Sequence, residues 1–235
     1  MQDSMRHPTP VSPQLGTHDG LAYALFLPEG EAAGGVVVLH GAGSCKENHF
    51  DFARALRAAG IAAAVFDQRG HGASEGALGA GVFDDVETVA ALLPPGPIAL
   101  RGSSMGGFIA LIAGARMDVA ALVAICPATG EMLAQGLSDR EFDFRADEAR
   151  LREALLGADE RAAAAALGQR LLLLHAEGDD RVPIEGSREL HAAAAGSRLV
   201  AAPGGDHRSV QHDPELQALA VRFIARALLH RPAPG

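Results

Sequence analysis

The sequence predicts an α/β fold whose mostly parallel sheet is flanked by helices, and three observations support this. Short apolar runs such as GGVVVLHG (34–41) and IAAAVFD (61–67) have the continuous hydrophobicity of strands buried on both faces. Segments with apolar residues at helical spacing alternate with these runs. A chain of 235 residues, 48% hydrophobic and 21% charged, can bury the core of such a domain.

The individual elements follow from local patterns. Strands are predicted for the apolar runs at 21–27, 34–41, 61–67, 97–102, 121–127, 170–177 and 197–203. Helices are predicted where the apolar spacing is close to 3.6 residues, at 50–59, 83–93, 105–115, 187–195 and 214–229. The last helix is expected to bury one face, made of Leu216, Leu219, Phe223 and Ala227.

Three segments describe the expected domain organisation. Residues 1–14 are Pro-rich and polar, so we expect a loose N-terminal arm, with a single domain over 15–235. The charged segment 128–170 interrupts the alternation of strands and helices, and its second half is strongly helix-prone. It is either a small cap-like helical insertion over one end of the sheet or a longer crossover, and we expect the insertion.

Composition excludes several classes of function. A formal charge of −9 and a pI near 5.5 disfavour nucleic-acid binding, which needs clustered Lys and Arg. The chain has no apolar stretch long enough to span a membrane, and its first residues lack the apolar region of a secretory signal. The two cysteines, Cys45 and Cys126, form no metal-ligand spacing. We therefore expect free thiols and a cytoplasmic protein; the oligomeric state cannot be predicted.

The stretch ALRGSSMGGFIAL (99–111) carries the first chemical motif. Only Ser104 has glycine at both −2 and +2, Gly102 and Gly106, whereas Ser103 has Arg101 and Met105 there. A serine on a sharp strand-to-helix turn adopts strained backbone angles, and the flanking residues must be small because they crowd together. This context predicts that Ser104 is a nucleophile.

A serine nucleophile needs a base and an orienting acid, which follow it in the order acid, then histidine. His207 lies in the Gly-rich loop PGGDHRS after the last strand and is the predicted base, with His212 as the alternative. Asp179 follows the strand LLLLHA and is the predicted acid, preferred over its neighbour Asp180. Asp206, beside His207, is expected to serve as a loop or capping residue.

The oxyanion of an acyl transfer needs backbone N–H donors. Met105, at the start of the helix after Ser104, is one expected donor, and Ala42 in the loop LHGAGSCKEN is the other, with Gly43 next. This loop is not a phosphate-binding loop because Cys45 and Glu47 stand where that motif needs glycine and Ser or Thr. No metal-ligand motif is present, so neither a cofactor nor a metal is expected.

Together, VVVLHGAG, FDQRGHGASEG, GSSMGG, LLLLHAEGDDRVP and GGDHRS resemble the α/β-hydrolase superfamily, in its usual order and over residues 36–209. The RGHGASEG segment and the HGAG loop are similar to the serine aminopeptidase, monoacylglycerol lipase and feruloyl esterase branches. The resemblance implies a serine hydrolase of esters, thioesters or amides, with Ala42 as an oxyanion donor. It also implies structural roles in loops for His40, Asp67, Arg69 and His71, and a functional role near the pocket is the alternative for His40. Ala176, where these families usually have glycine, is a departure.

The predicted function is therefore a carboxylesterase-type serine hydrolase, acting on small soluble short-acyl esters through an acyl-enzyme on Ser104. The insertion is short and charged rather than broad and apolar, and only 4% of the residues are aromatic. Phe142 and Phe144 in the insertion either line an acyl pocket or cover the core. The alternatives are a thioesterase, a peptidase or a carbon–carbon hydrolase with the same triad, or a non-catalytic ligand-binding protein.

Overall fold

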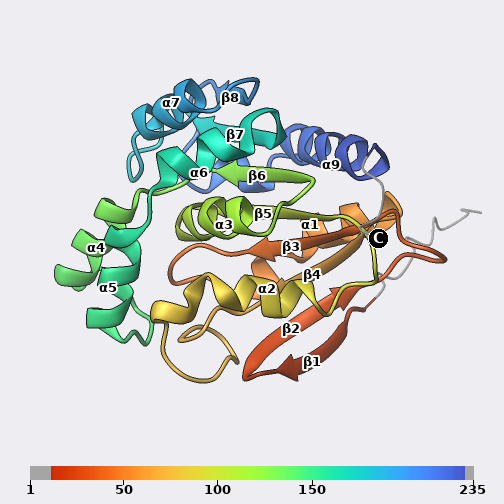
Figure 1. Cartoon of the computed structure of the whole chain (residues 1–235), viewed down its shortest axis with the longest axis horizontal. Coiled ribbons are helices and arrows are strands. Elements are labelled where there is room, and N and C mark those ends of the chain that lie inside the picture. Colours follow the sequence, from red (N-terminus) through yellow and green to blue (C-terminus); the bar gives the residue numbers. More distant parts are fainter. Residues whose placement is uncertain (1–11, 231–235) are drawn as a thin grey trace, which may run out of the picture.

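An eight-stranded sheet lies at the centre of the computed structural model, which describes residues 12–230 (Figure 1). Its strand order is β1-β2-β4-β3-β5-β6-β7-β8. Strands β3 to β8 are mutually parallel, and β1 and β2 pair in antiparallel fashion at one edge. The strands are β1 (Gln14–His18), β2 (Leu21–Phe26), β3 (Gly35–Leu39), β4 (Ala62–Phe66), β5 (Ile98–Ser103), β6 (Ala121–Ile125), β7 (Leu171–Ala176) and β8 (Arg198–Ala202).

The predicted α/β fold is confirmed, and the central strands explain why the prediction succeeds. Strands β3, β4, β6 and β7 are buried at every position, which is the pattern that helices on both faces impose. Strand β1 was not predicted. It is a largely exposed edge strand with the sequence QLGTH, so it lacks the apolar signal that identified the others.

Helices cover both faces of the sheet. They are α1 (Phe50–Ala58), α2 (Asp84–Ala90), α3 (Met105–Arg116), α4 (Gly130–Ser138), α5 (Glu148–Gly157), α6 (Glu160–Leu167), α7 (Ile184–Ala193), α8 (Ser209–His212) and α9 (Pro214–Leu229), with short 3-10 turns at Lys46–His49, Ala80–Val82 and Gly168–Arg170. Helices α2, α3, α6 and α7 pack on one face, and α1 and α9 pack on the other. No helix in residues 12–230 is both long enough and apolar enough to cross a membrane.

Helix α9 has the predicted bounds, because Asp213 caps its N-terminus through the N–H groups of Glu215 and Leu216 and Pro214 occupies the first turn. Its predicted buried face was displaced. The fully buried residues are Ala220, Ile224 and Leu228, whereas the predicted residues Leu216, Leu219, Phe223 and Ala227 are only partly buried beside them. The helix packs against β5, β6 and β7, and the residues that face these strands are each one position after a predicted residue.

The segment 128–170 contains helices α4, α5 and α6, which have different neighbours. Helix α6 packs against α3 and α7, as a crossover helix does, whereas α4 and α5 pack against each other beyond one end of the sheet (Figure 1). We call residues 130–157, which span α4, α5 and the connection between them, the cap. The division of the chain into an arm at 1–14, a domain at 15–235 and an insertion at 128–170 stays a prediction, and residues 1–11 lie outside the described range.

Candidate active site

Ser104 occupies the sharp corner between β5 and α3. Its backbone angles are φ 54° and ψ −120°, a conformation that costs a non-glycine residue about 1–3 kcal/mol. The Ser104 N–H donates to the carbonyl of Ile125 on the neighbouring strand β6 at 2.9 Å, which holds the corner to the sheet. The first turn of α3 begins at Met105, so Ser104 lies where helix N–H groups have no intrahelical acceptor.

The glycines on either side of Ser104 are required by close backbone contacts. A Cβ at Gly102 would lie 2.0 Å from the carbonyl oxygen of Gly106. A Cβ at Gly106 would lie 2.4 Å from the carbonyl oxygen of His40, at the end of β3. The mutual crowding expected from the sequence therefore holds for Gly102, while Gly106 is restricted by the neighbouring strand.

The structure brings together two further predicted residues, Asp179 after β7 and His207 after β8. The Nδ1 atom of His207 lies 2.7 Å from Oδ2 of Asp179, whose side chain is completely buried. A carboxylate can only accept, so Nδ1–H of His207 donates and Nε2 is left as the proton acceptor. This is the tautomer that a general base for a hydroxyl requires.

Several donors keep Asp179 ionised. Burial raises the pKa of this carboxyl, but hydrogen bonds from the N–H of Val182, from His207 and from the N–H of Arg181 outweigh burial and lower the pKa below its ordinary value. Both backbone N–H groups donate to Oδ1 at 2.9 Å, so the two carboxylate oxygens have different tasks. Oδ1 fixes the loop, and Oδ2 holds the imidazole.

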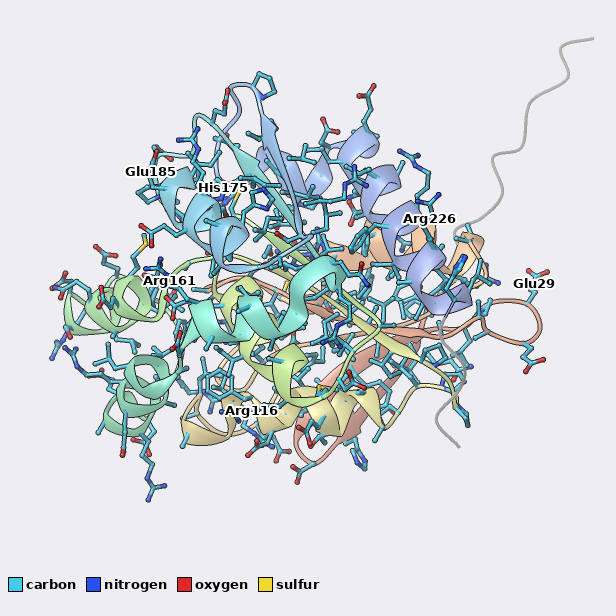
Figure 2. The ribbon with its side chains drawn as sticks, turned by 45° about the horizontal axis from the view of Figure 1, so that its top comes forward. Glu29, Arg116, Arg161, His175, Glu185 and Arg226 are labelled. Atoms are coloured by element: carbon cyan, nitrogen blue, oxygen red, sulfur yellow. The ribbon has the colours of Figure 1, made fainter. Side chains whose placement is uncertain are left out.

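His175, at the end of β7, supports the same loop from inside. Its Nε2 lies 2.9 Å from the carbonyl of Val182, and its Nδ1 lies 2.7 Å from the Ser187 hydroxyl on α7. Figure 2 shows His175 close to α7 and inside the molecule. Nε2 must carry the proton, since a carbonyl only accepts. His175 is thus committed to the backbone next to Asp179.

The alternative residues lie elsewhere. His212 pairs through Nδ1 with Oδ2 of Asp51 at 3.0 Å rather than with Asp179. Asp180 is exposed. Asp206 accepts the N–H groups of Arg208 and Ser209 at 2.9 Å, whereas helix α8 has no side-chain cap, so of the two roles expected for Asp206 it has the loop role.

The loop after β3 faces Ser104, and its amides are not equivalent. The N–H of Gly43 donates to Nε2 of His71 at 3.2 Å, so this amide is already used. Among the described residues, the N–H of Ala42 has no hydrogen-bond acceptor. Gly41 packs closely on the corner, since a Cβ there would lie 3.2 Å from Cβ of Ser104. These contacts favour Ala42 over Gly43 as the amide left for a ligand.

His40 and Asp67 are structural, as the resemblance implied. His40 is completely buried. Its Nδ1 donates to the carbonyl of Gly41 at 2.8 Å, and its Nε2 accepts the N–H of Gln68 at 3.0 Å. Burial lowers the pKa of His40 to about 4, so it stays neutral. Asp67 accepts the Lys46 ammonium at 2.7 Å and the N–H of Ala73 at 2.9 Å, and thereby ties two loops together.

Arg101, one residue before Gly102, is a buried residue that sequence reasoning did not identify. It is 1% exposed; its Nη1 lies 2.6 Å from Nδ1 of His49 and its Nη2 donates to the carbonyl of Gln211 at 3.2 Å. Its guanidinium also lies over the ring of Phe52, and burial lowers the pKa of Arg101 to about 10. Arg101 therefore joins the strand of Ser104 to helix α8, which follows His207. The available signal was an arginine inside the apolar strand IALRGS.

Cys126, His175 and Asp179 bring a sulfur, a nitrogen and a carboxylate oxygen within 4.8 Å of one another. His175 and Asp179 are already committed to the contacts described above. Burial raises the pKa of Cys126 to about 12, which disfavours the thiolate that binds metals. These residues therefore fit the support of Asp179 better than the binding of a metal.

A cleft of about 930 Å³ opens over Ser104 and His207, both of which line it. Loop residues 41–44 form one wall, and the cap forms the other. Outside that loop, the cleft is lined by the apolar residues Ala128, Met132, Leu133, Phe142 and Val182. The charged residues that line it are Glu141, Asp143, Arg181 and Arg208. The cleft can therefore receive a molecule that combines apolar and polar parts.

Comparison with known proteins finds two family models that match this chain. Residues 30–142 match the family model described as serine aminopeptidase, S33, and residues 157–232 match the one described as TAP-like protein. The comparison with curated proteins finds no match.

Solved structures share the fold over nearly the whole chain. Est1E from Butyrivibrio proteoclasticus with bound ferulic acid is 20% identical, with a TM-score of 0.73 over 92% of this chain and 98% of that one. Monoacylglycerol lipase from Paleococcus ferrophilus is 21% identical, with a TM-score of 0.69 over 89% and 98%. A carboxyl esterase from Bacillus coagulans is 15% identical, with a TM-score of 0.71 over 93% and 99%. With its sheet order, its serine corner and these matches, the chain belongs to the α/β-hydrolase superfamily.

Proposed function

We propose that this protein is a serine hydrolase that cleaves small carboxylic esters through an acyl-enzyme on Ser104. One observation carries the proposal: the strained Ser104 and His207 line the same cleft, and the buried Asp179 holds the imidazole of His207 at 2.7 Å. A serine hydroxyl is a weak nucleophile until a base takes its proton, and His207 offers a free Nε2 for that purpose.

In this mechanism, the Ser104 hydroxyl attacks the acyl carbonyl while Nε2 of His207 takes its proton. Asp179 holds the imidazole in its tautomer and stabilises the imidazolium. The N–H groups of Ala42 and Met105 donate to the tetrahedral oxyanion, and each such donor is typically worth about 10²–10³ in rate. His207 then protonates the leaving alcohol, and water, activated by His207, releases the acid from Ser104.

The space around Ser104 supports a preference for short acyl groups. Beyond Phe142, the apolar interior lined by Met105 and Leu133 contains only about 10 Å³ of free volume. This volume is no larger than the space that one water molecule needs. A long acyl chain would therefore have to lie along the open cleft rather than enter the core.

Initial rates on p-nitrophenyl esters from acetate to palmitate, for the wild type and Ser104→Ala, test this proposal. Activity that depends on Ser104 and peaks at short chains is the expected result. A peak at long chains would contradict the short-acyl preference. Labelling of Ser104 by a fluorophosphonate without turnover of any ester would point to thioesters, amides or carbon–carbon bonds, and the absence of labelling would contradict a serine hydrolase.

A further inference from the structure

A column of rings connects the cap to the loop that follows β3. The rings of Phe142 and Phe144 in the cap stack with centroids 5.4 Å apart. Phe144 in turn stacks on His71 at 4.3 Å with an interplanar angle of 28°, and His71 contacts His40 edge-on at 4.8 Å. Phe142 lines the cleft, whereas Phe144 is directed to His71. The two phenylalanines therefore have different surroundings.

His71 accepts a hydrogen bond from the loop beside Ser104. Its Nδ1 lies 3.1 Å from the carbonyl of Arg69, which can only accept, so the proton is on Nδ1. Nε2 is then the acceptor of the N–H of Gly43 at 3.2 Å. Only the neutral imidazole can accept, and burial lowers the pKa of His71, which favours that form.

Backbone hydrogen bonds fasten the cap to the segment that carries His71. The N–H of Arg145 donates to the carbonyl of Gly70 at 3.3 Å, and the carbonyl of Arg145 accepts the N–H of Leu78 at 2.9 Å. The N–H of Asp147 donates back to the carbonyl of Leu78 at 2.8 Å. Because residues on both sides of His71 are paired with the cap, the stacking of Phe144 on His71 is held in place.

We propose that His71 is a positioning residue for the oxyanion, which fixes the Gly43 amide and thereby the direction of the adjacent Ala42 N–H, and that Phe144 of the cap holds the His71 ring for this task. This rests on the proposed function of Ser104 and Ala42. Gly43 follows Ala42 directly, so rotation of the Gly43 peptide changes the loop that presents the Ala42 amide. The cap thus contributes to the chemistry without contacting the reacting atoms.

Three variants test separately the His71 ring, its acceptor atom Nε2 and the support from Phe144. His71→Phe keeps a ring to stack on Phe144 and removes the acceptor, whereas His71→Gln loses the ring and places a carbonyl oxygen at a similar reach from Cα as Nε2. Phe144→Ala leaves His71 intact and removes its support. For each variant we would measure kcat and KM on p-nitrophenyl acetate, the rate of Ser104 phosphonylation by a fluorophosphonate, and the Tm as a check of folding.

We expect His71→Phe to lower kcat and the phosphonylation rate by about 10- to 100-fold, less than the 10²–10³ for loss of a donor itself. KM should stay within about twofold, because ground-state contacts are unchanged. His71→Gln should recover most of the loss, and Phe144→Ala should fall between them. The same kcat in His71→Phe as in the wild type, or an equal loss in His71→Gln, would overturn the proposal.

If His71→Phe does not fold, Phe144→Ala still tests the proposal, since wild-type kcat in that variant would overturn the role assigned to the cap. Failure of the proposed function looks different. In that case the wild type itself is not phosphonylated at Ser104, whereas failure of this inference leaves the wild type reactive.

Discussion

Replacing Asp179 with asparagine tests the orientation of the imidazole, because the structure dictates how the amide must lie. Oδ1 of Asp179 accepts two backbone N–H groups at 2.9 Å, from Arg181 and Val182. An NH₂ group cannot accept, so Asp179→Asn must keep its oxygen at that position. Its NH₂ then faces Nδ1 of His207, where the wild type has a carboxylate oxygen at 2.7 Å.

The reversed donor changes the tautomer of His207. Nδ1 becomes the acceptor, the proton moves to Nε2, and Nε2 can no longer take the proton of Ser104. Turning the amide over would leave buried donors unpaired at about 1–3 kcal/mol each, so this escape is disfavoured. We therefore expect kcat to fall on the order of 10⁴-fold, the size of this effect in a serine protease triad.

The assay is the initial rate on p-nitrophenyl acetate at equal concentrations of folded protein, with circular dichroism and Tm to verify folding. Asp180→Asn is the matched control, because Asp180 is the adjacent exposed carboxylate and should keep most of the activity. A folded Asp179→Asn variant that retains more than about a tenth of kcat would refute the reasoning. So would a loss confined to Asp180→Asn.

Three further predictions concern stability. Gly102→Ala places a methyl group 2.0 Å from the carbonyl oxygen of Gly106 and should lower the free energy of unfolding in urea by about 1–3 kcal/mol. Fluorophosphonate labelling of Ser104 should be lost as well. Wild-type stability would show that the corner relaxes. Arg101→Met removes the charged donor to the part-buried carbonyl of Gln211 and should cost about 1.5–3 kcal/mol by the same assay. No change in stability would show that water replaces the guanidinium at this carbonyl. Asp67 has a pKa lowered below its ordinary value, because hydrogen bonds from Lys46 and from backbone N–H groups outweigh burial, which raises it. The ionised Asp67 therefore contributes to the free energy of unfolding above the unfolded pKa of about 3.9, and this contribution is lost as pH falls through the lower folded pKa. The difference in stability between the wild type and Asp67→Asn should shrink from pH ~6 to pH ~3. A constant difference would contradict this.

Much of the fold could be predicted because its signals are local. The fully buried strands β3, β4, β6 and β7 are continuous apolar runs, and α9 begins at the predicted residue because Asp213 and Pro214 define its N-terminus. The exposed edge strand β1 lacked such a signal. The buried face of α9 was displaced because that face depends on the strands beneath it.

In the candidate site, too, relationships between residues close in the chain could be predicted, whereas those between distant residues could not. Gly102, Ser104 and Gly106 are close in the chain, so their steric relationship can be inferred from the sequence. Whether His207 or His212 meets Asp179 depends on the path of the loop after β8, and the structure pairs His207 with Asp179. The roles that we assign to these residues stay proposals until the variants are measured.

The sequence by itself determined the alternation of strands and helices, the serine corner and the order of the acid and the histidine, because each depends on neighbouring residues or on a motif of fixed spacing. Only the tertiary structure decided that Arg101 reaches Gln211 and that Phe144 stacks on His71. These partners lie 110 and 73 residues apart in the chain. Contacts at such separation arise from how the sheet and the cap pack, and no local pattern of residues encodes them.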